Sequence, residues 1–148
     1  MRIFWRPDGP PAGQSPARLE DGMFKLLIIE DDRIMSKVLV RIFTSEGYEV
    51  MQVNTIAEGF SACLKELPDL VLMDINLPDG NGLDLCAKMK ENPRIRHIPI
   101  VMLTGDATSV DSKVQGLAAG AEDYVLKPFI NEELTARVAG ILKRSFNH

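Results

Sequence analysis

Short apolar runs alternate with amphipathic segments from Lys25 onward. Apolar runs bounded by turn residues favour buried strands, whereas longer segments with a period of about 3.6 residues favour helices. Their alternation is typical of a parallel sheet that is covered by helices on both faces. We therefore predict an α/β fold whose five strands lie at residues 26–29, 48–53, 70–73, 98–103 and 124–126.

Capping residues and helix breakers set the limits of the helices between these strands. Thr55 and Glu58 form a capping-box pattern, Gly120 is suited to end a helix and Asn131 to begin one. The five helices are expected at residues 32–45, 55–67, 82–91, around 110–118 and from 131 onward.

Apolar residues at helical spacing predict which face of each helix packs on the sheet. The predicted faces are Ile34, Val38, Leu39 and Ile42 in the first helix, Ala57, Phe60, Leu64 and Leu67 in the second, and Leu134, Val138, Ile141 and Leu142 in the last. The chain stops after this last helix, and we expect no output domain.

Residues 1–22 differ from the rest, because four prolines and three glycines interrupt any regular pattern. Both residue types disfavour helix and sheet. We predict a flexible tail at residues 1–22, followed by one domain at residues 23–148. A short docking element at Ile3–Trp5 and a native start at Met23 are the alternatives for this tail.

The composition is that of one soluble globular domain. The chain has 148 residues, of which 45% are apolar, and a formal net charge of -4, which argues against a nucleic-acid surface and favours protein or cation partners. No apolar stretch approaches the ~20 residues of a membrane helix, and there is no signal-peptide pattern. Cys63 and Cys86 lack metal-site spacing, and we expect them reduced in a cytoplasmic protein.

Reactive polar side chains follow four of the five predicted strands. Asp74 ends the third strand, and Glu30 and Asp31 follow the first. Thr104 and Lys127 follow the fourth and the fifth. In an open parallel sheet with the strand order 2-1-3-4-5, these strand ends meet at one crevice. We therefore expect the five side chains to form one site.

The chemistry of this set favours a metal ion and phosphate. Neighbouring carboxylates repel each other unless a cation lies between them, and Mg2+ prefers oxygen ligands beside phosphate. Phosphoryl transfer needs positioning and neutralisation of charge, which Lys127, the Thr104 hydroxyl and a metal can supply. Asp74 is then suited to accept a phosphoryl group. A solvated acidic corner is the alternative for Glu30 and Asp31 taken alone.

Four segments, taken in order, resemble the receiver domain of two-component response regulators. They read Leu-Leu-Ile-Ile-Glu-Asp-Asp, Asp-Ile-Asn-Leu-Pro-Asp-Gly-Asn-Gly, Val-Met-Leu-Thr-Gly and Asp-Tyr-Val-Leu-Lys-Pro-Phe. Each segment is a weak signal by itself, whereas the ordered set is specific. The resemblance covers residues 24–146 and implies a flavodoxin-like fold, with a five-stranded parallel sheet of order 2-1-3-4-5.

The resemblance also implies roles for the acidic residues. Asp74 would accept the phosphoryl group from the phosphohistidine of a sensor histidine kinase or from a small phosphodonor. Asp31 and Asp74 would bind Mg2+ directly, Glu30 through a water molecule, and Asn76 through its backbone carbonyl. Asp32 takes a variable position in the family and is left out of this set.

Further positions of the family pattern concern the phosphoryl group and its readout. Lys127 would pair with the phosphoryl oxygens, and its peptide bond to Pro128 would be cis. Thr104 and Tyr124 match the switch pair, whose movement favours an active protein-binding surface. The spacing between these two residues is one longer than is common in the family, which leaves the shape of the fourth loop open.

Two more residues bear on the lifetime of the phosphoryl group. Asn76 and Asp106 fall where side chains of the family influence the attacking water. We predict from them a comparatively fast self-dephosphorylation. Polar loop residues without kinetic effect are the alternative interpretation.

The resulting functional prediction is a single-domain response regulator that switches a protein-binding surface. A relay that passes the phosphoryl group to a histidine phosphotransfer protein is the alternative. A hydrolase acting through an aspartyl phosphate is a minor one, because such enzymes place a second aspartate where Asn76 stands. A degenerate receiver that serves only as a scaffold is disfavoured by the complete set of site residues. Asp74 is thus expected to be a modified residue, with no enzyme activity beyond its own phosphorylation and dephosphorylation.

Overall fold

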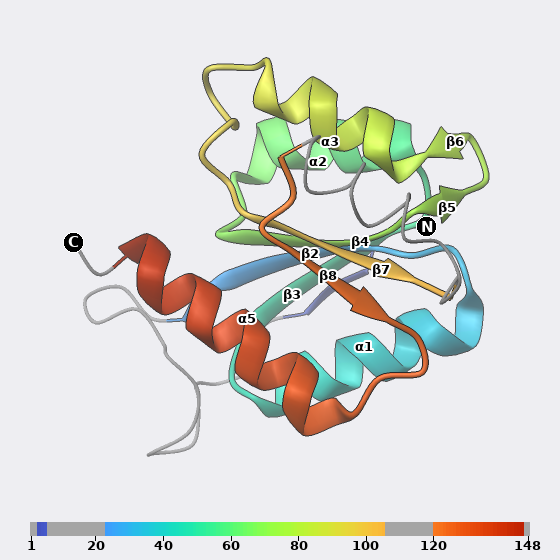
Figure 1. Ribbon diagram of the computed structural model, residues 1–148, viewed down its shortest axis with the longest axis vertical. Helices are drawn as coiled ribbons and strands as arrows, with labels where there is room; N and C mark the ends of the chain where they lie inside the picture. Colours follow the sequence, from blue (N-terminus) through green and yellow to red (C-terminus); the bar gives the residue numbers. More distant parts are fainter. Residues whose placement is uncertain (1–2, 6–22, 106–119, 147–148) are drawn as a thin grey trace.

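A parallel sheet forms the centre of the computed structural model, which describes residues 3–5, 23–105 and 120–146 (Figure 1). Its parallel strands are β2 (Lys25–Ile29), β3 (Glu49–Val53), β4 (Leu70–Asp74), β7 (Ile100–Thr104) and β8 (Asp123–Leu126). Their order is β3-β2-β4-β7-β8, which is 2-1-3-4-5 when these five are counted along the chain. The predicted α/β fold and strand order are confirmed.

An additional strand, β1 (Ile3–Trp5), is absent from the prediction. It pairs antiparallel with β3 and forms one edge of the sheet. Backbone groups at a free edge accept another strand whatever its side chains are, so apolar pattern and proline content are poor guides to this pairing. The expectation that the tail forms no sheet is therefore wrong for these three residues. The flexible tail predicted at residues 6–22 lies outside the described residues.

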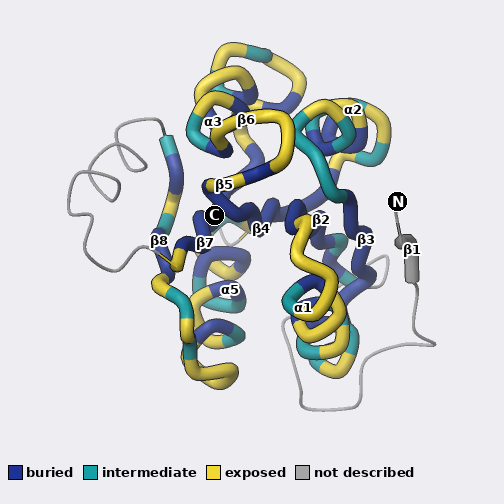
Figure 2. The backbone as a smooth tube through the Cα atoms, turned by 90° about the vertical axis from the view of Figure 1, so that its right-hand side faces the viewer, coloured by how far each residue is buried: buried dark blue, intermediate teal, exposed yellow. Residues whose placement is uncertain are grey.

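Helices cover both faces of the sheet (Figure 1). One face carries α2 (Ile56–Glu66) and α3 (Gly82–Lys90), and the other carries α1 (Arg33–Ser45) and α5 (Asn131–Phe146). Figure 2 shows the strands as a buried layer between these helices, whose outer sides are exposed. The predicted helix around residues 110–118 lies outside the described residues. Within the described part of the chain, no helix is long and apolar enough to cross a membrane.

Capping residues fix where the first two helices begin. The Asp32 side chain caps α1 by accepting a hydrogen bond from the amide of Met35 at 2.8 Å. Thr55 caps α2, and its side chain accepts a hydrogen bond from the amide of Glu58 at 3.1 Å. The carboxylate of Glu58 in turn accepts from the amide of Asn54. The predicted cap of the second helix is therefore confirmed, with the return bond displaced by one residue.

The predicted sheet-facing side of α1 is wrong at two positions. Ile34 is 76% exposed and Val38 39% exposed, whereas Leu39 is fully buried. The buried face runs instead through Ser36, Leu39 and Phe43. Ile34 lies two residues before Ser36, which corresponds to a rotation of about 200° around the helix axis.

The predicted face of α2 is also wrong in part. Ala57 and Leu67 are exposed, and Phe60 and Leu64 are only partly buried. The buried side chains are small ones, namely Gly59, Ala62 and Cys63. Small residues let a helix lie close to the sheet, so size rather than apolarity marks the contact face here. In α5 the predicted face is confirmed, since the four residues predicted for it, Leu134, Val138, Ile141 and Leu142, are all buried.

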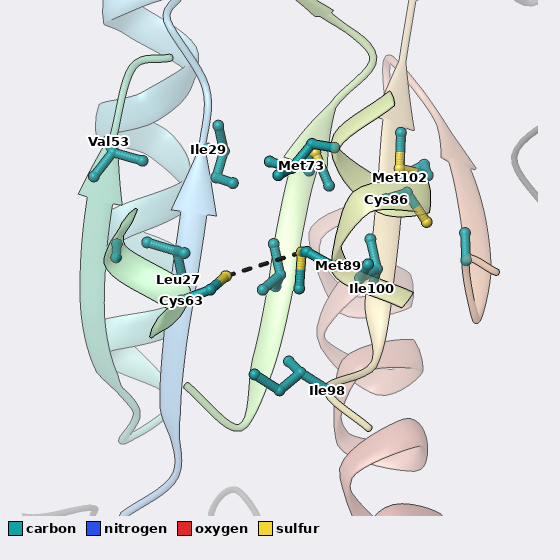
Figure 3. Close-up of a cluster of buried hydrophobic side chains, with 14 of the residues drawn as sticks. Leu27, Ile29, Val53, Cys63, Met73, Cys86, Met89, Ile98, Ile100 and Met102 are labelled. Atoms are coloured by element: carbon teal, nitrogen blue, oxygen red, sulfur yellow. Dashed lines mark hydrogen bonds between the residues drawn. The ribbon is translucent and has the colours of Figure 1, made fainter. Parts of the chain in front are cut away.

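Two apolar cores fill the space between the layers, and Figure 3 shows the one beneath α2 and α3. Leu27 and Met73 of the sheet meet Cys63, Cys86 and Met89 of the helices in this core. The sulfur atoms of Cys63 and Met89 are 3.9 Å apart. Both cysteines are free and buried, and burial raises the pKa of the Cys63 thiol to about 12. The predicted position of both cysteines in the core is confirmed.

Gly82 is expected to tolerate no side chain, because it packs against the backbone of the acceptor strand. A Cβ atom there would lie 2.5 Å from the carbonyl oxygen of Asp74 and 3.2 Å from Cα of Ile75. We expect Gly82→Ala to lower the free energy of unfolding by about 1–3 kcal/mol, since the backbone would have to shift. Urea denaturation followed by circular dichroism measures this change.

Gly140 in α5 provides the matched control, because a Cβ atom there meets nothing closer than Arg144 at 3.7 Å. We expect Gly140→Ala to raise the free energy of unfolding by about 0.5–1 kcal/mol, since alanine loses less backbone entropy in a helix. Changes of the same sign in both variants would contradict this assignment.

Candidate functional site

The carboxyl ends of β2, β4, β7 and β8 bring the predicted site residues to one edge of the sheet. Ile29 pairs with Met73, and Asp74 with Leu103, in the register of neighbouring strands. Glu30 therefore follows its strand at the level where Asp74 ends the next one. The amide of Lys127 donates to the carbonyl oxygen of Thr104 at 2.7 Å, which joins the remaining two strand ends.

The ammonium group of Lys127 connects the two buried acids of the site. Its Nζ atom donates to Oε1 of Glu30 at 2.7 Å and to Oδ2 of Asp74 at 3.1 Å. The other oxygen of each acid accepts a backbone amide, from Asp32 to Glu30 and from Asn76 to Asp74. Both oxygens of each carboxylate are therefore fixed in direction.

Three carboxylates form a cluster that could hold a cation. One ligand atom each from Glu30, Asp31 and Asp74 lie within 4.8 Å of one another, and this is the only such group of acids, cysteines or histidines in the described part of the chain. Glu30 is fully buried and Asp74 is 8% exposed, whereas Asp31 faces solvent. An all-oxygen cluster open on one side suits Mg2+, which keeps several of its water ligands. The residues present therefore fit this metal.

Burial and charge act against each other at this site. Burial raises the pKa of the Glu30 carboxyl to about 7, with a further contribution from Asp74, although the hydrogen bond from Lys127 acts in the opposite direction. Burial alone would lower the pKa of Lys127, but its hydrogen bonds and charge interactions with both acids outweigh this and raise it. Lys127 therefore stays charged. A second cation would stabilise the ionised form of Glu30.

The predicted switch residues are both buried. Thr104 is 1% exposed at the end of β7, and Tyr124 is 7% exposed in β8. The Tyr124 hydroxyl has no hydrogen-bond partner among the described residues. The peptide bond between Lys127 and Pro128 is cis, as expected from the resemblance. Of the remaining site residues, the Asn76 side chain is exposed, and Asp106 lies outside the described residues.

Sequence reasoning missed two residues that support the site from outside. Gln52 is buried in β3 and donates to the carbonyl oxygen of Glu30, and Asp79 accepts two amides at the start of α2. The available signals were weak. Gln52 is a polar residue within an apolar strand, and Asp79 stands in a Pro-Asp-Gly turn, where aspartate is common for local reasons.

The model of the response regulator receiver domain family matches residues 26–139. The chain belongs to this family. The phosphate regulon transcriptional regulatory protein PhoB of Rhizobium meliloti is 39% identical over 124 residues, which cover 82% of this chain and 53% of that protein. The DNA-binding response regulator MtrA of Mycobacterium tuberculosis is 36% identical over 121 residues, which cover 82% of this chain and 51% of that protein. The chain thus spans about half the length of these curated relatives.

Solved structures support the same assignment. A CheY-like response regulator receiver domain protein from Methanospirillum hungatei is 31% identical, with a TM-score of 0.77 over 82% of this chain and 95% of that one. The receiver domain of the sensor histidine kinase PA1611 from Pseudomonas aeruginosa is 29% identical, with a TM-score of 0.73 over 84% of this chain and 98% of that one. That structure has a magnesium ion coordinated in its active-site cleft. The predicted family and its flavodoxin-like fold are confirmed.

Glu30 should make the metal-free protein less stable as the pH rises. Its pKa is about 7 in the folded chain, compared with an ordinary value of 4.5. Between these values the folded state holds a proton that the unfolded state has lost, so the stabilisation present at low pH disappears as the pH rises through about 7. We expect Glu30→Gln to remove this pH dependence of stability. At about pH 8 its free energy of unfolding should be higher than that of the original chain by on the order of 2 kcal/mol.

Urea denaturation between about pH 5 and pH 8, in the presence of a chelator, measures this effect. Glu122→Gln is the control, because it removes an acid that is exposed. An unchanged pH slope in Glu30→Gln, or an equal loss of slope in Glu122→Gln, would show that burial of Glu30 is not its cause.

Proposed function

We propose that this chain is a phosphorylation switch in which Asp74 accepts a phosphoryl group from the phosphohistidine of a sensor histidine kinase. The observation that carries the proposal is the contact of the Lys127 ammonium with Asp74 and Glu30, within a cluster of three carboxylates at the strand ends. Membership of the receiver family supports it, since receiver domains are phosphoacceptors in signalling and interact with histidine kinases.

The geometry suggests how the chain's own residues act in this transfer. An oxygen of Asp74 attacks the phosphorus, the bond between phosphorus and the imidazole nitrogen breaks, and the electron pair stays on the imidazole. The amide of Asn76 already holds Oδ1 of Asp74, which fixes the direction of attack. Lys127 and the Thr104 hydroxyl then neutralise and orient the phosphoryl oxygens, because such transfer depends on positioning and charge stabilisation.

A divalent cation completes the proposed site. Asp31 and Asp74 would bind Mg2+ directly, Glu30 would bind it through water, and the Asn76 backbone carbonyl would be a further ligand. When bound, Mg2+ supplies positive charge beside the transferring group. The cluster of carboxylates and the raised pKa of Glu30 support this assignment, because both favour a cation between the acids.

The readout that we propose uses Thr104 and Tyr124. The hydroxyl of Thr104 turns to the phosphoryl group, and the ring of Tyr124 follows, which changes the surface around β8 and α5. Because the Tyr124 hydroxyl makes no hydrogen bond within the described residues, the ring can move without breaking one. Such a change shifts an existing equilibrium between two states of the surface.

Two functions are candidates for the phosphorylated chain. We propose that the phosphorylated chain binds a protein target, with relay to a histidine phosphotransfer protein as the second candidate. The relay is favoured by one finding, namely that two similar solved structures are receiver domains of histidine kinases. Return of labelled phosphoryl from Asp74 to a histidine phosphotransfer protein would support the relay.

Intact mass spectrometry tests the acceptor. With Mg2+ and a small phosphodonor, we expect the original chain to gain the mass of one phosphoryl group and Asp74→Asn to gain none. Asp84→Asn is the matched control, because it removes an exposed acid in the first turn of α3. It should be phosphorylated like the original chain. Equal gain by Asp74→Asn, or no gain by any variant with an active cognate kinase, would contradict the proposal.

The lifetime of the phosphoryl group tests the polar residues beside it. Asn76 and Asp106 are proposed to orient the attacking water, so replacing both by alanine should slow decay by about tenfold or more. The loss of label from phosphorylated protein, after removal of the donor, gives the rate. An unchanged rate would assign both residues to the loop surface without kinetic effect.

A further inference from the structure

Residues 52–57, which run from the end of β3 into the start of α2 and are termed the β3–α2 connection, carry no group assigned to the site, yet they contact both loops that do. The first of these loops follows β2 and carries Glu30 and Asp31. The second follows β4 and consists of the hairpin of β5 (Asn76–Leu77) and β6 (Gly80–Asn81). Two side chains make these contacts, one from the connection and one from the hairpin.

Gln52 fixes the first loop. It is 2% exposed, and its Nε2 atom lies 2.8 Å from the carbonyl oxygen of Glu30, 2.9 Å from that of Val53 and 2.8 Å from Oδ1 of Asn54. Backbone pairing with β3 ends where the amide of Glu30 donates to Val53 at 3.1 Å. Gln52 thus adds one side-chain bond beyond the sheet and fixes the peptide plane that joins Glu30 to Asp31. The direction of the Asp31 side chain depends on that plane.

Asp79 fixes the second loop. It lies at the tip of the hairpin, and its carboxylate accepts the amides of Ile56 at 2.8 Å and Ala57 at 3.0 Å. These are the first two amides of α2, which have no acceptor within the helix itself. The same two bonds hold the pKa of Asp79 below its ordinary value. The hairpin is therefore attached to α2 at its tip.

The hairpin is short, so its attachment at the tip also constrains the residues next to the acceptor, Asp74. It has only two residue pairs, Leu77 with Gly80 next to the tip and Asn76 with Asn81 at the base. Leu77 is buried, which holds the same strand from its inner side. The base is joined to the acceptor directly, because the amide of Asn76 donates to Oδ1 of Asp74. A shift of Asp79 would therefore displace the carbonyl group of Asn76.

We propose that Gln52 and Asp79 are positioning residues for the metal site, and that they set the separation of its two loops by anchoring both to the β3–α2 connection. The inference rests on the proposed function, since it concerns the residues that would bind Mg2+. Carboxylates and a carbonyl from separate loops bind an octahedral ion only at a fixed separation. Loss of a hydrogen bond that orients a metal ligand, without itself contacting the metal, changes metal affinity by about 10–100-fold.

Calorimetric titration of the full chain with Mg2+ tests the proposal. We expect Gln52→Met, which keeps the length of the side chain but not its donor, and Asp79→Ala each to weaken Mg2+ binding about tenfold. Asp79→Asn should recover most of the affinity, because its side-chain oxygen still accepts a backbone amide. Val138→Ala is the control, since it shortens a buried side chain of α5 and lowers stability without touching either loop.

A second measurement needs no metal. Hydrogen exchange of the Glu30 amide, which donates to the carbonyl oxygen of Val53, should become faster in the metal-free Gln52→Met chain, because the neighbouring bond from Gln52 to the Glu30 carbonyl no longer holds this end of the strand pair. It should stay the same in Asp79→Ala, whose anchor acts on the other loop. Circular dichroism confirms that each variant is folded under the conditions used.

These measurements separate the inference from the proposed function. Folded variants of Gln52 and Asp79 that bind Mg2+ as tightly as the original chain would overturn the inference, as would an equal loss of affinity in Val138→Ala. If the original chain binds no Mg2+, the proposed metal role fails. Exchange at Glu30 then decides whether Gln52 holds its loop, and an unchanged rate overturns that part too.

Discussion

The site depends on a single lysine ammonium that lies between two carboxylates which the fold removes from water. Glu30 is fully buried and Asp74 nearly so, and two acids in such positions would repel each other and retain protons. Lys127 offsets this repulsion by donating to both. Because it does not suffice to return the pKa of Glu30 to its ordinary value, the site still favours a further positive charge. That remaining preference is the physical basis for assigning a cation to it.

This contact exists only because of the order of the strands. Lys127 and Glu30 are 97 residues apart in the sequence, and they meet because β2, β4, β7 and β8 run parallel and end at the same edge. The helices on both faces keep the strands buried along their length. The strand ends are then the places where charged side chains can reach both one another and solvent. The fold therefore concentrates its polar chemistry at one edge.

The strands and the site residues were the most predictable parts of this protein. Strands buried on both faces appear as nearly continuous apolar runs, and a charged residue that ends such a run stands out, as Asp74 does. The helix faces were less predictable. Ile34 belongs to the apolar pattern of α1 but is largely exposed, whereas Gly59 and Ala62 of α2 carry little apolar surface and are buried. The apolar period predicts that a helix has a buried side, but the surface against which the helix packs decides which residues lie on that side.

What the sequence determined by itself was local or periodic, namely the apolar strands, the cap of Thr55, and the acids that end their strands. These features depend on bonds within about four residues or on burial that repeats along one element. Only the tertiary structure decided the rotation of α1 and α2, the edge position of β1, and the contacts of Gln52 and Asp79. The physical reason is that such contacts join backbone groups from separate elements, and almost any polar side chain of suitable length can make them once the elements are in place.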